Sequence, residues 1–468
     1  MTKGVALAFW ALAFALATGL SWLIPPMQSP DETSHLARAY LVAQGHWLLQ
    51  PAPEILQPPK DPKVAAFVSR LGGQADAGGL VDPSLLSFMA ANLNLALDSK
   101  LRLSAEQQQA LAELRWSEAR IHFSIPRTGY YFPLVYAPQA AGLAIGMALD
   151  WSVEHSYRLA RTVTLLACFL LLAAACRLTP PSPLALATLL LPMSLFQLLS
   201  PTLDGLTTSL GLLTLSLFLR QVALRGKNPA ASAGLLSICV LVLVTSRTHL
   251  LPLLALPFLV AWQRRSARDF SLAAVTAAGA LAWVLFALHS TTDTLVLRSH
   301  TGGELLRHYA MHPGAFLAVV FASLSDPGLS SFYQQSFIGI LGWLDTALPA
   351  LFYPLLWIEL GACALASISF SGGAQDRGAR WLLLLASLAS VALIFLSQLV
   401  TWTPHPATLV QGVQGRYFVM PVLMLGYALS GAAAPATALR YRLGAVTLGG
   451  FALTSLLALT MTLLSRYH

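Results

Sequence analysis

Charged residues are scarce in this sequence, and their scarcity excludes an ordinary soluble globular protein. Only 10% of the 468 residues are charged and 56% are hydrophobic, whereas soluble chains typically carry about 25% charged residues. Apolar stretches of roughly 20 residues, long enough to cross a bilayer, recur along most of the length. The composition therefore predicts a polytopic integral membrane protein. The net charge of +8 does not indicate nucleic-acid binding, because the basic residues sit in short loops, where they orient a membrane protein.

Several motifs that carry soluble chemistry are absent. The four cysteines have no metal or disulfide spacing, so we interpret them as small buried hydrophobic residues. No glycine-rich phosphate loop follows a strand, which argues against binding of a soluble nucleotide. His308 and His312 have metal-compatible spacing, but Pro313 ends their helix and no third ligand is evident. The sequence therefore predicts no metal site, although a divalent metal ion stays open as a cofactor.

Short basic loops determine the predicted topology. The positive-inside rule places four of them in the cytoplasm, at residues 220–229, 263–269, 375–380 and 440–442. Counting apolar stretches between these loops predicts about eleven transmembrane helices, one of them over residues 183–200. Residues 1–24 form the first, with the N-terminus in the cytoplasm. Residues 25–156 then form a large extracytoplasmic loop, and residues 157–468 form the transmembrane bundle, with a second external segment at 290–345.

Two apolar segments in these external regions are predicted not to cross the membrane. Residues 130–150, "YYFPLVYAPQAAGLAIGMALD", resemble a span in composition, but the count of crossings leaves them outside as an interfacial helix. Residues 315–324 are too short to cross. The first external loop also predicts an amphipathic helix over 104–123, capped by Ser104 with Gln107 three residues later.

The stretch "QSPDETSHLARAYLVAQGHW", residues 28–47, places two carboxylates directly after the first span. Asp31 and Glu32 suit the N-terminus of a helix that ends at Gly45. They also suit general-base catalysis or ion coupling in a transporter. All three interpretations stay open at this point. His35 and Arg38, four and seven residues after Asp31, are expected to share its helix face.

Three segments together resemble a bacterial family called domain of unknown function 2142: "PPMQSPDETSHLARAY", "GILGWLDTALP" and "VQGRYFVMP". The first also resembles the motif after the first span of the C-type glycosyltransferases, such as the lipid A aminoarabinose transferases and, more distantly, the protein O-mannosyltransferases. This resemblance implies an all-α, GT-C-like bundle with juxtamembrane helices in a large first external loop. The count of crossings gives the same layout independently.

The resemblance implies a function as well. It implies inverting transfer of a sugar from a polyprenyl-phosphate donor to a glycan, lipid or protein acceptor, on the extracytoplasmic face of the bacterial inner (plasma) membrane. Asp31 matches the catalytic general base and Glu32 its neighbour. The alternative is a transporter or flippase of a lipid-linked cell-envelope precursor. The lack of a convincing internal repeat and the long external loop argue against that alternative.

The donor phosphate is an anion, so we expect cationic side chains to bind it, and arginine binds phosphate bidentately. The candidates predicted at the outer face are Arg158, Arg161, Arg247, Arg298 and Arg416, and each could instead be an interfacial snorkelling residue. We favour Arg247, at a hairpin tip, and Arg416, in "QGRYF". The aminoarabinose transferases have a basic residue after their "YF"; here "YYFPL" lacks it, and Arg127 is a substitute. The remaining candidate substrate-binding residues are His35, Arg38, Tyr130, Tyr131, Asp204, His249, Asp345 and Tyr417, with helix capping as the alternative for the two aspartates.

Overall fold

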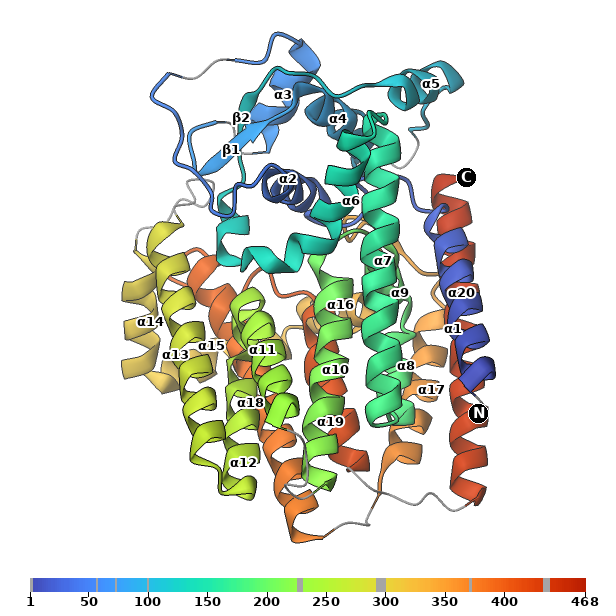
Figure 1. Ribbon diagram of the computed structural model, residues 1–468, viewed down its shortest axis with the longest axis vertical. Helices are drawn as coiled ribbons and strands as arrows, with labels where there is room; N and C mark the ends of the chain where they lie inside the picture. The colour runs from blue at the N-terminus through green and yellow to red at the C-terminus, as the bar shows by residue number, and fades with distance from the viewer. Residues whose placement is uncertain are drawn as a thin grey trace.

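The structure is a computed structural model, and it describes residues 3–55, 58–71, 74–98, 101–224, 230–291, 300–369, 373–431 and 438–468. Long helices run roughly parallel through the lower part of the molecule, and shorter elements form a cap over one end of them (Figure 1). The cap and the bundle have separate hydrophobic cores. The predicted all-α membrane protein is thus confirmed in its main features, with two small sheets added.

The cap is built from residues between the first span and the second. Its elements are α2 (Glu32–Ala43), α3 (Pro62–Arg70), β1 (Gly78–Val81), α4 (Pro83–Leu97), α5 (Ala105–Glu113) and β2 (Ile121–Ser124). Strands β1 and β2 pair antiparallel. The buried side chains of α2, α3 and α4 meet in one apolar core that also includes the start of α7 (Val153–Leu178).

Local sequence signals explain where several cap helices begin and end. Ser104 and Gln107 form the predicted capping box of α5. That helix ends at Glu113 rather than at 123, and the last three residues of the predicted helix belong to strand β2 instead. Helix α2 ends at Ala43, and Gly45 then adopts φ +84°, a left-handed conformation that glycine tolerates.

The segment 130–150 forms short helices beneath the cap. They are η1 (Pro126–Tyr130), η2 (Pro133–Tyr136) and α6 (Ala137–Ala148). With 12 residues, α6 is about 18 Å long, too short to cross a hydrocarbon layer of roughly 30 Å. It packs against α2 and α7. Gly142 and Gly146 allow the close approach to α7, because a Cβ at Gly142 would lie 2.4 Å from Ala160 Cα.

Among the residues that the structure describes, six helices are long and apolar enough to cross a membrane. They are α1 (Lys3–Ser21), α7, α10 (Leu203–Ala223), α13 (Ala267–Ser290), α18 (Ala374–Thr401) and α20 (Ala438–Tyr467). The side chains of α1 are mostly exposed, as expected for a helix that faces lipid. The chain is therefore a multi-pass membrane protein.

Other apolar stretches that the sequence predicts as spans are short or interrupted. Prolines begin both α8 (Pro183–Leu189) and α9 (Pro192–Leu199), which divide the predicted span over 183–200. The remaining short elements are α11 (Ala230–Ser246), η3 (Thr248–Leu254), α12 (Ala255–Arg264), α17 (Phe352–Ser367), η4 (Gly415–Phe418) and α19 (Val419–Ser430). The predicted number of about eleven spans is therefore not reached by single long helices in the described residues.

The predicted second external segment contains substantial apolar helices. Helix α14 (Gly302–Met311) precedes α15 (Pro313–Ser325) and α16 (Pro327–Gly339), and the last two are bent by 76° relative to each other. This pair is either a broken span or a re-entrant loop, and counting it gives up to seven spans. Strands β3 (Ile340–Leu341) and β4 (Thr346–Ala347) pair after it.

Candidate functional site

Asp31 adopts an unusual backbone conformation at the start of α2. Its φ is +64°, in the left-handed region that residues other than glycine rarely occupy. Its side chain makes no capping hydrogen bond to the helix, so capping does not account for its carboxylate. The side chain is 60% exposed, and its Oδ2 accepts a hydrogen bond from Arg416 Nη2 at 3.1 Å. Strained, exposed and ion-paired residues of this kind concentrate at functional sites.

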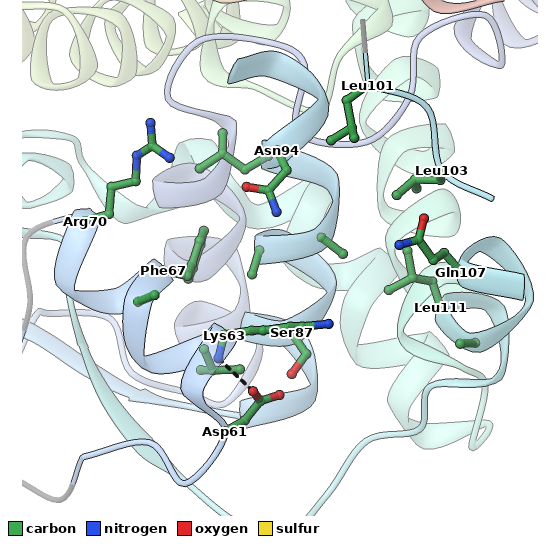
Figure 2. A pocket seen from close by; sticks show the side chains of 16 residues that line it. Asp61, Lys63, Phe67, Arg70, Ser87, Asn94, Leu101, Leu103, Gln107 and Leu111 are labelled. Carbon is green, nitrogen blue, oxygen red and sulfur yellow. Dashed lines mark hydrogen bonds between the residues drawn. The ribbon is translucent and has the colours of Figure 1, made fainter. Parts of the chain in front are cut away.

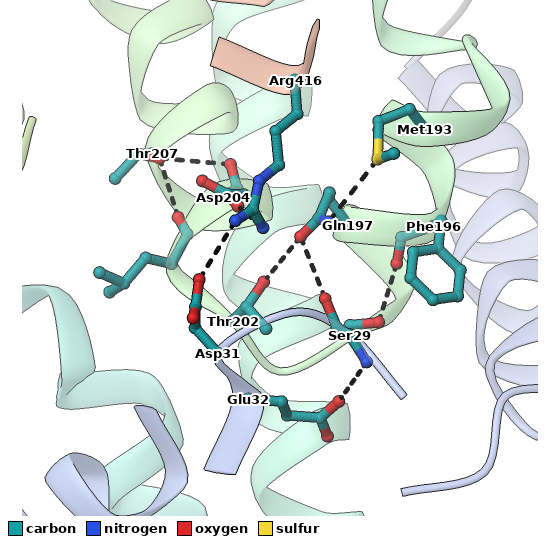
Figure 3. Close-up of polar contacts among 12 residues, drawn as sticks. Ser29, Asp31, Glu32, Met193, Phe196, Gln197, Thr202, Asp204, Thr207 and Arg416 are labelled. Atoms are coloured by element: carbon teal, nitrogen blue, oxygen red, sulfur yellow. Dashed lines mark hydrogen bonds and ion pairs between the residues drawn. The ribbon is translucent and has the colours of Figure 1, made fainter. Parts of the chain in front are cut away.

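An alternating chain of charges extends from Asp31 into the molecule. Arg416 Nη1 donates to Asp204 Oδ2 at 3.1 Å, and Arg247 Nη2 donates to Asp204 Oδ1. The Asp31–Arg416–Asp204 part is shown in Figure 3. Asp204 lies in the first turn of α10 without capping it, Arg247 directly precedes η3, and Arg416 lies in η4. We call these four residues, Asp31, Arg416, Asp204 and Arg247, the charge chain.

Gly415 sets the position of Arg416. A Cβ at Gly415 would lie 2.0 Å from the backbone nitrogen of Phe337, so only glycine permits this approach to α16. The Gly415 N–H also donates to Ser336 Oγ at 2.8 Å. Arg416 is consequently held with its side chain 5% exposed, and its guanidinium group is fixed between two carboxylates.

Glu32 points to the opposite side of the α2 N-terminus. It is completely buried, and Tyr157 Oη donates to its Oε1 at 2.5 Å. Its Oε2 accepts from the Ser29 N–H at 3.0 Å. Burial raises the pKa of Glu32 above its usual value near 4.5, against the opposing charge of Arg161. The contacts of Glu32 anchor the turn that carries Asp31.

A polar layer beneath this turn was not identified from the sequence. Ser29 Oγ and Thr202 Oγ1 both donate to Gln197 Oε1 at 3.2 Å (Figure 3). All three side chains are buried. They fix the distance between the N-terminal motif and the start of α10, which holds Asp204. A serine, a glutamine and a threonine far apart in the sequence give no periodic signal that could have linked them.

His35 lies one turn after Asp31 and contacts the tyrosines of the "YYFPLVY" segment. Its Nδ1 is 2.9 Å from Tyr136 Oη, and its ring centroid is 5.6 Å from that of Tyr131. Burial lowers the pKa of His35 to about 4, with the Asp31 charge opposing this and Arg247 reinforcing it. Burial likewise raises the pKa of Tyr131 to about 12. His35 is therefore neutral at pH 7, and Tyr131 keeps its proton.

Two cavities meet at the charge chain. The smaller, of about 30 Å³, lies between Asp204, Arg416 and Met193 and has room for about one water molecule. The larger, of about 270 Å³, is lined by Arg247, Tyr131 and Tyr417 and by side chains of α13 and α18, many of them apolar. Four of the predicted residues line this larger cavity besides Arg247, namely Tyr130, Tyr131, His249 and Tyr417.

The structure places other candidate residues away from the charge chain. Arg38 donates to the carbonyls of His46 and Trp47, at 3.3 and 2.6 Å, and thereby closes the loop after α2. Arg161 donates to the carbonyls of Ser21, Ile24 and Leu199, at 2.8–3.0 Å.

Of the remaining candidates, Arg127, Arg158 and Asp345 make contacts elsewhere in the structure. The Arg127 guanidinium lies 4.5 Å from the Trp402 ring centre. Arg158 contacts Glu154, and Asp345 accepts from the Trp343 N–H at 3.0 Å and contacts Arg466. Arg298 lies outside the described residues.

Metal-ligating residues do not gather in the described part of the chain. No group of three or more His, Cys, Asp or Glu side chains there is arranged to hold a metal ion. The rings of His308 and His312 stack with their centres 4.8 Å apart. Two imidazoles alone do not make up such a group, and among the described residues no third ligand completes it.

A further cavity lies within the cap, between α3, α4 and α5 (Figure 2). It has a volume of about 480 Å³ and mainly apolar walls, such as Phe67 and Leu111, with Lys63 and Arg70 among its polar residues. None of the predicted site residues lines it. Size alone therefore does not identify the site. The largely buried ion pairs of Asp204 with Arg247 and Arg416 favour the smaller cavities at the charge chain.

The chain was compared with known proteins in three ways. The model of one family, described as "Predicted membrane protein (DUF2142)", matches residues 14–425. No curated protein and no solved structure matches the chain significantly. The family match covers α1 to α19 and includes all four residues of the charge chain. The protein therefore belongs to the family of predicted membrane proteins called domain of unknown function 2142.

Proposed function

We propose that this protein is a membrane glycosyltransferase with a GT-C-like architecture of about eleven membrane-crossing segments. It transfers a sugar from a polyprenyl-phosphate donor to a glycan, lipid or protein acceptor on the extracytoplasmic face of the bacterial inner membrane. The observation that carries the proposal is the charge chain. In it, an exposed, strained carboxylate at Asp31 pairs with Arg416, which is linked through Asp204 to Arg247 at a largely apolar cavity.

The larger cavity supports a donor that is both apolar and anionic. Its lining includes apolar side chains such as Leu288 and Ile394, and also the Arg247 guanidinium group. A polyprenyl chain suits this lining because apolar side chains surround it much as lipid tails do, and a phosphate suits a guanidinium group that can donate two hydrogen bonds. Tyr131 and Tyr417 add neutral hydroxyl donors to the lining of the same cavity.

In the proposed reaction, Asp31 takes the proton of the acceptor hydroxyl. The acceptor oxygen forms a bond to the anomeric carbon, and the bond from that carbon to the phosphate oxygen breaks with its electron pair. Arg247 and Arg416 stabilise the negative charge that develops on the leaving polyprenyl phosphate. The position of Asp31 suits a general base, because its side chain is 60% exposed and Arg416 fixes the orientation of its carboxylate.

The arginines are already paired with aspartates, and this pairing suggests how they respond to the donor. Two aspartates balance Arg247 and Arg416 in the structure. A phosphate that binds these arginines would compete with Asp31 for Arg416. Competition of that kind frees the Asp31 carboxylate when donor is present, and so couples donor binding to the availability of the base.

The test is mass spectrometry of lipid-linked sugars and surface glycans in cells with and without the gene. Loss of the gene should make one polyprenyl-phosphate sugar accumulate and one glycan mass disappear, and restoring the gene should reverse both changes. A lipid-linked sugar that changes membrane leaflet without any change in glycan mass would indicate a flippase instead. Unchanged pools of both kinds would contradict sugar transfer.

A further inference from the structure

A second pocket rich in arginine lies at another edge of the cap. It has a volume of about 270 Å³ and shares no lining residue with the cavity at Arg247. Its lining includes Arg102, Arg158 and Arg466, together with Trp22 and Tyr467. Arg158 was predicted from the sequence to contact the donor phosphate, so its presence in this separate pocket calls for a different explanation.

The positive charges in this pocket exceed its negative charges. Arg158 pairs with Glu154, and its guanidinium lies 4.0 Å from the Trp22 ring centre. Arg466 donates to the Leu95 carbonyl at 2.8 Å and is 3.4 Å from the Asp345 carboxylate. With Arg102 included, three guanidinium groups thus face two carboxylates, those of Glu154 and Asp345.

Two of these arginines are held in place before any ligand arrives. The Arg466 side chain is only 8% exposed and the Arg158 side chain 28% exposed. Because their positions are fixed by Leu95, Trp22 and Glu154, an anion that binds them orders few additional rotamers. Prior fixing of this kind lowers the entropic cost of binding.

The pocket lies where membrane-facing helices end. Trp22 directly follows α1, and Tyr467 ends α20. His468 Nε2 is 3.2 Å from the Leu23 carbonyl, which joins the two helix ends. Leu16 on α1 and Leu464 on α20 are 61% and 45% exposed, as expected for side chains that contact acyl chains. Tryptophan, tyrosine and arginine at such helix ends are typical of the level of lipid headgroups.

We propose that this pocket binds the headgroup phosphate of an anionic membrane lipid, whose acyl chains lie against α1 and α20. The proposal does not depend on sugar transfer, because the pocket is separate from the charge chain. It assigns Arg158 and Arg102 to a lipid that stays with the protein, rather than to a substrate. Headgroup recognition follows from charge-assisted hydrogen bonds between guanidinium groups and phosphate oxygens.

The test is native mass spectrometry of the full chain, purified in detergent and titrated with phosphatidylglycerol or with phosphatidylcholine of the same acyl chains. We expect the wild type to retain phosphatidylglycerol preferentially. The R102Q/R158Q variant should bind it about tenfold more weakly. The K63Q/R70Q variant is the matched control, because it also loses two positive charges, but from exposed positions elsewhere in the cap.

Three results would overturn the proposal. One is equal retention of both lipids by the wild type, and another is equal loss of phosphatidylglycerol binding in both variants. The third is inorganic phosphate at millimolar concentration displacing all bound lipid while itself binding in its place, which would indicate a site for a free anion. R102Q alone keeps the contacts of Arg158 with Glu154 and Trp22, so a smaller loss of phosphatidylglycerol binding in this folded variant excludes misfolding as the cause.

Discussion

The two sides of the α2 N-terminus carry adjacent carboxylates in opposite environments. On the outer side, Asp31 is 60% exposed and pairs with Arg416. On the inner side, Glu32 is completely buried and accepts hydrogen bonds from Tyr157 and the Ser29 backbone. One peptide unit therefore separates a solvent-exposed carboxylate from one that holds the turn. The difference shows that the residue type alone does not define a catalytic acid or base.

Replacement of Asp31 by asparagine should break the outer side of this comparison with the largest effect. Asparagine tolerates the left-handed backbone and keeps a hydrogen-bond acceptor for Arg416, but it cannot take a proton. Transfer from the lipid-linked donor should fall by about 10²–10⁴-fold, with the thermal midpoint of the purified protein nearly unchanged. Initial rates of donor consumption measure this effect, and E106Q at an exposed position of α5 is the control. Wild-type rates in the Asp31 variant would exclude the role of base.

Asp204 extends the comparison into the bundle, because it pairs with the same Arg416 that holds Asp31. Asp204→Asn removes the charge that balances Arg247 and Arg416, whose side chains are 14% and 5% exposed. Buried ion pairs that lose one partner cost about 3–5 kcal/mol, so the thermal midpoint in detergent should drop clearly. Asp326→Asn serves as the control, since asparagine also caps a helix well at that position. An equal midpoint for both variants would show that the arginines need no counterion.

His35, one turn after Asp31, should make the stability of the folded protein depend on pH. Its pKa falls to about 4 in the folded protein from 6.5, so the unfolded chain binds a proton below pH 6.5 and the folded protein does not until about pH 4. Stability should therefore decrease as the pH falls from 6.5 toward 4, by at most about 3 kcal/mol. Thermal midpoints across this range should be less pH-dependent in His35→Gln than in the wild type. Parallel profiles would assign the pH dependence to other groups.

Glu32 tests the inner side with the smallest expected effect. Glu32→Ala leaves Tyr157 Oη and the Ser29 N–H without their acceptor, which costs about 1–3 kcal/mol. Glu32→Gln keeps an acceptor oxygen and should cost less. Urea or thermal unfolding followed by tryptophan fluorescence measures both changes. If Glu32→Gln unfolds like the wild type but has no transfer activity, Glu32 has a chemical role that its burial does not suggest.

Of the candidate site, the sequence predicts the residues of the charge chain best. Asp31, Asp204, Arg247 and Arg416 were each candidates, from a motif or from an expected position at the outer face, and the structure brings them into one chain of contacts. Charged residues are rare in such a chain, so each one near an expected helix end is informative.

Other features depend on packing that no local pattern reveals. In the sequence, Arg161 is a candidate phosphate ligand and Arg38 a candidate substrate-binding residue. In the structure, Arg161 donates to carbonyls of distant segments and Arg38 to carbonyls of the loop after α2. The 76° bend between α15 and α16, and the division of the predicted 183–200 span at Pro192, likewise reduce the number of long helices. Proline marks both places, yet composition alone does not say whether a proline kinks a span or divides it.

The measurement that tests the account most directly compares two variants in cells. Lipid-linked sugars and surface glycans would be measured by mass spectrometry in membranes that contain Asp31→Asn or Glu32→Gln at equal protein level. The account predicts that Asp31→Asn accumulates one polyprenyl-phosphate sugar and loses one glycan mass, whereas Glu32→Gln resembles the wild type. Wild-type pools in the Asp31→Asn membranes would contradict the central claim that Asp31 is the catalytic base.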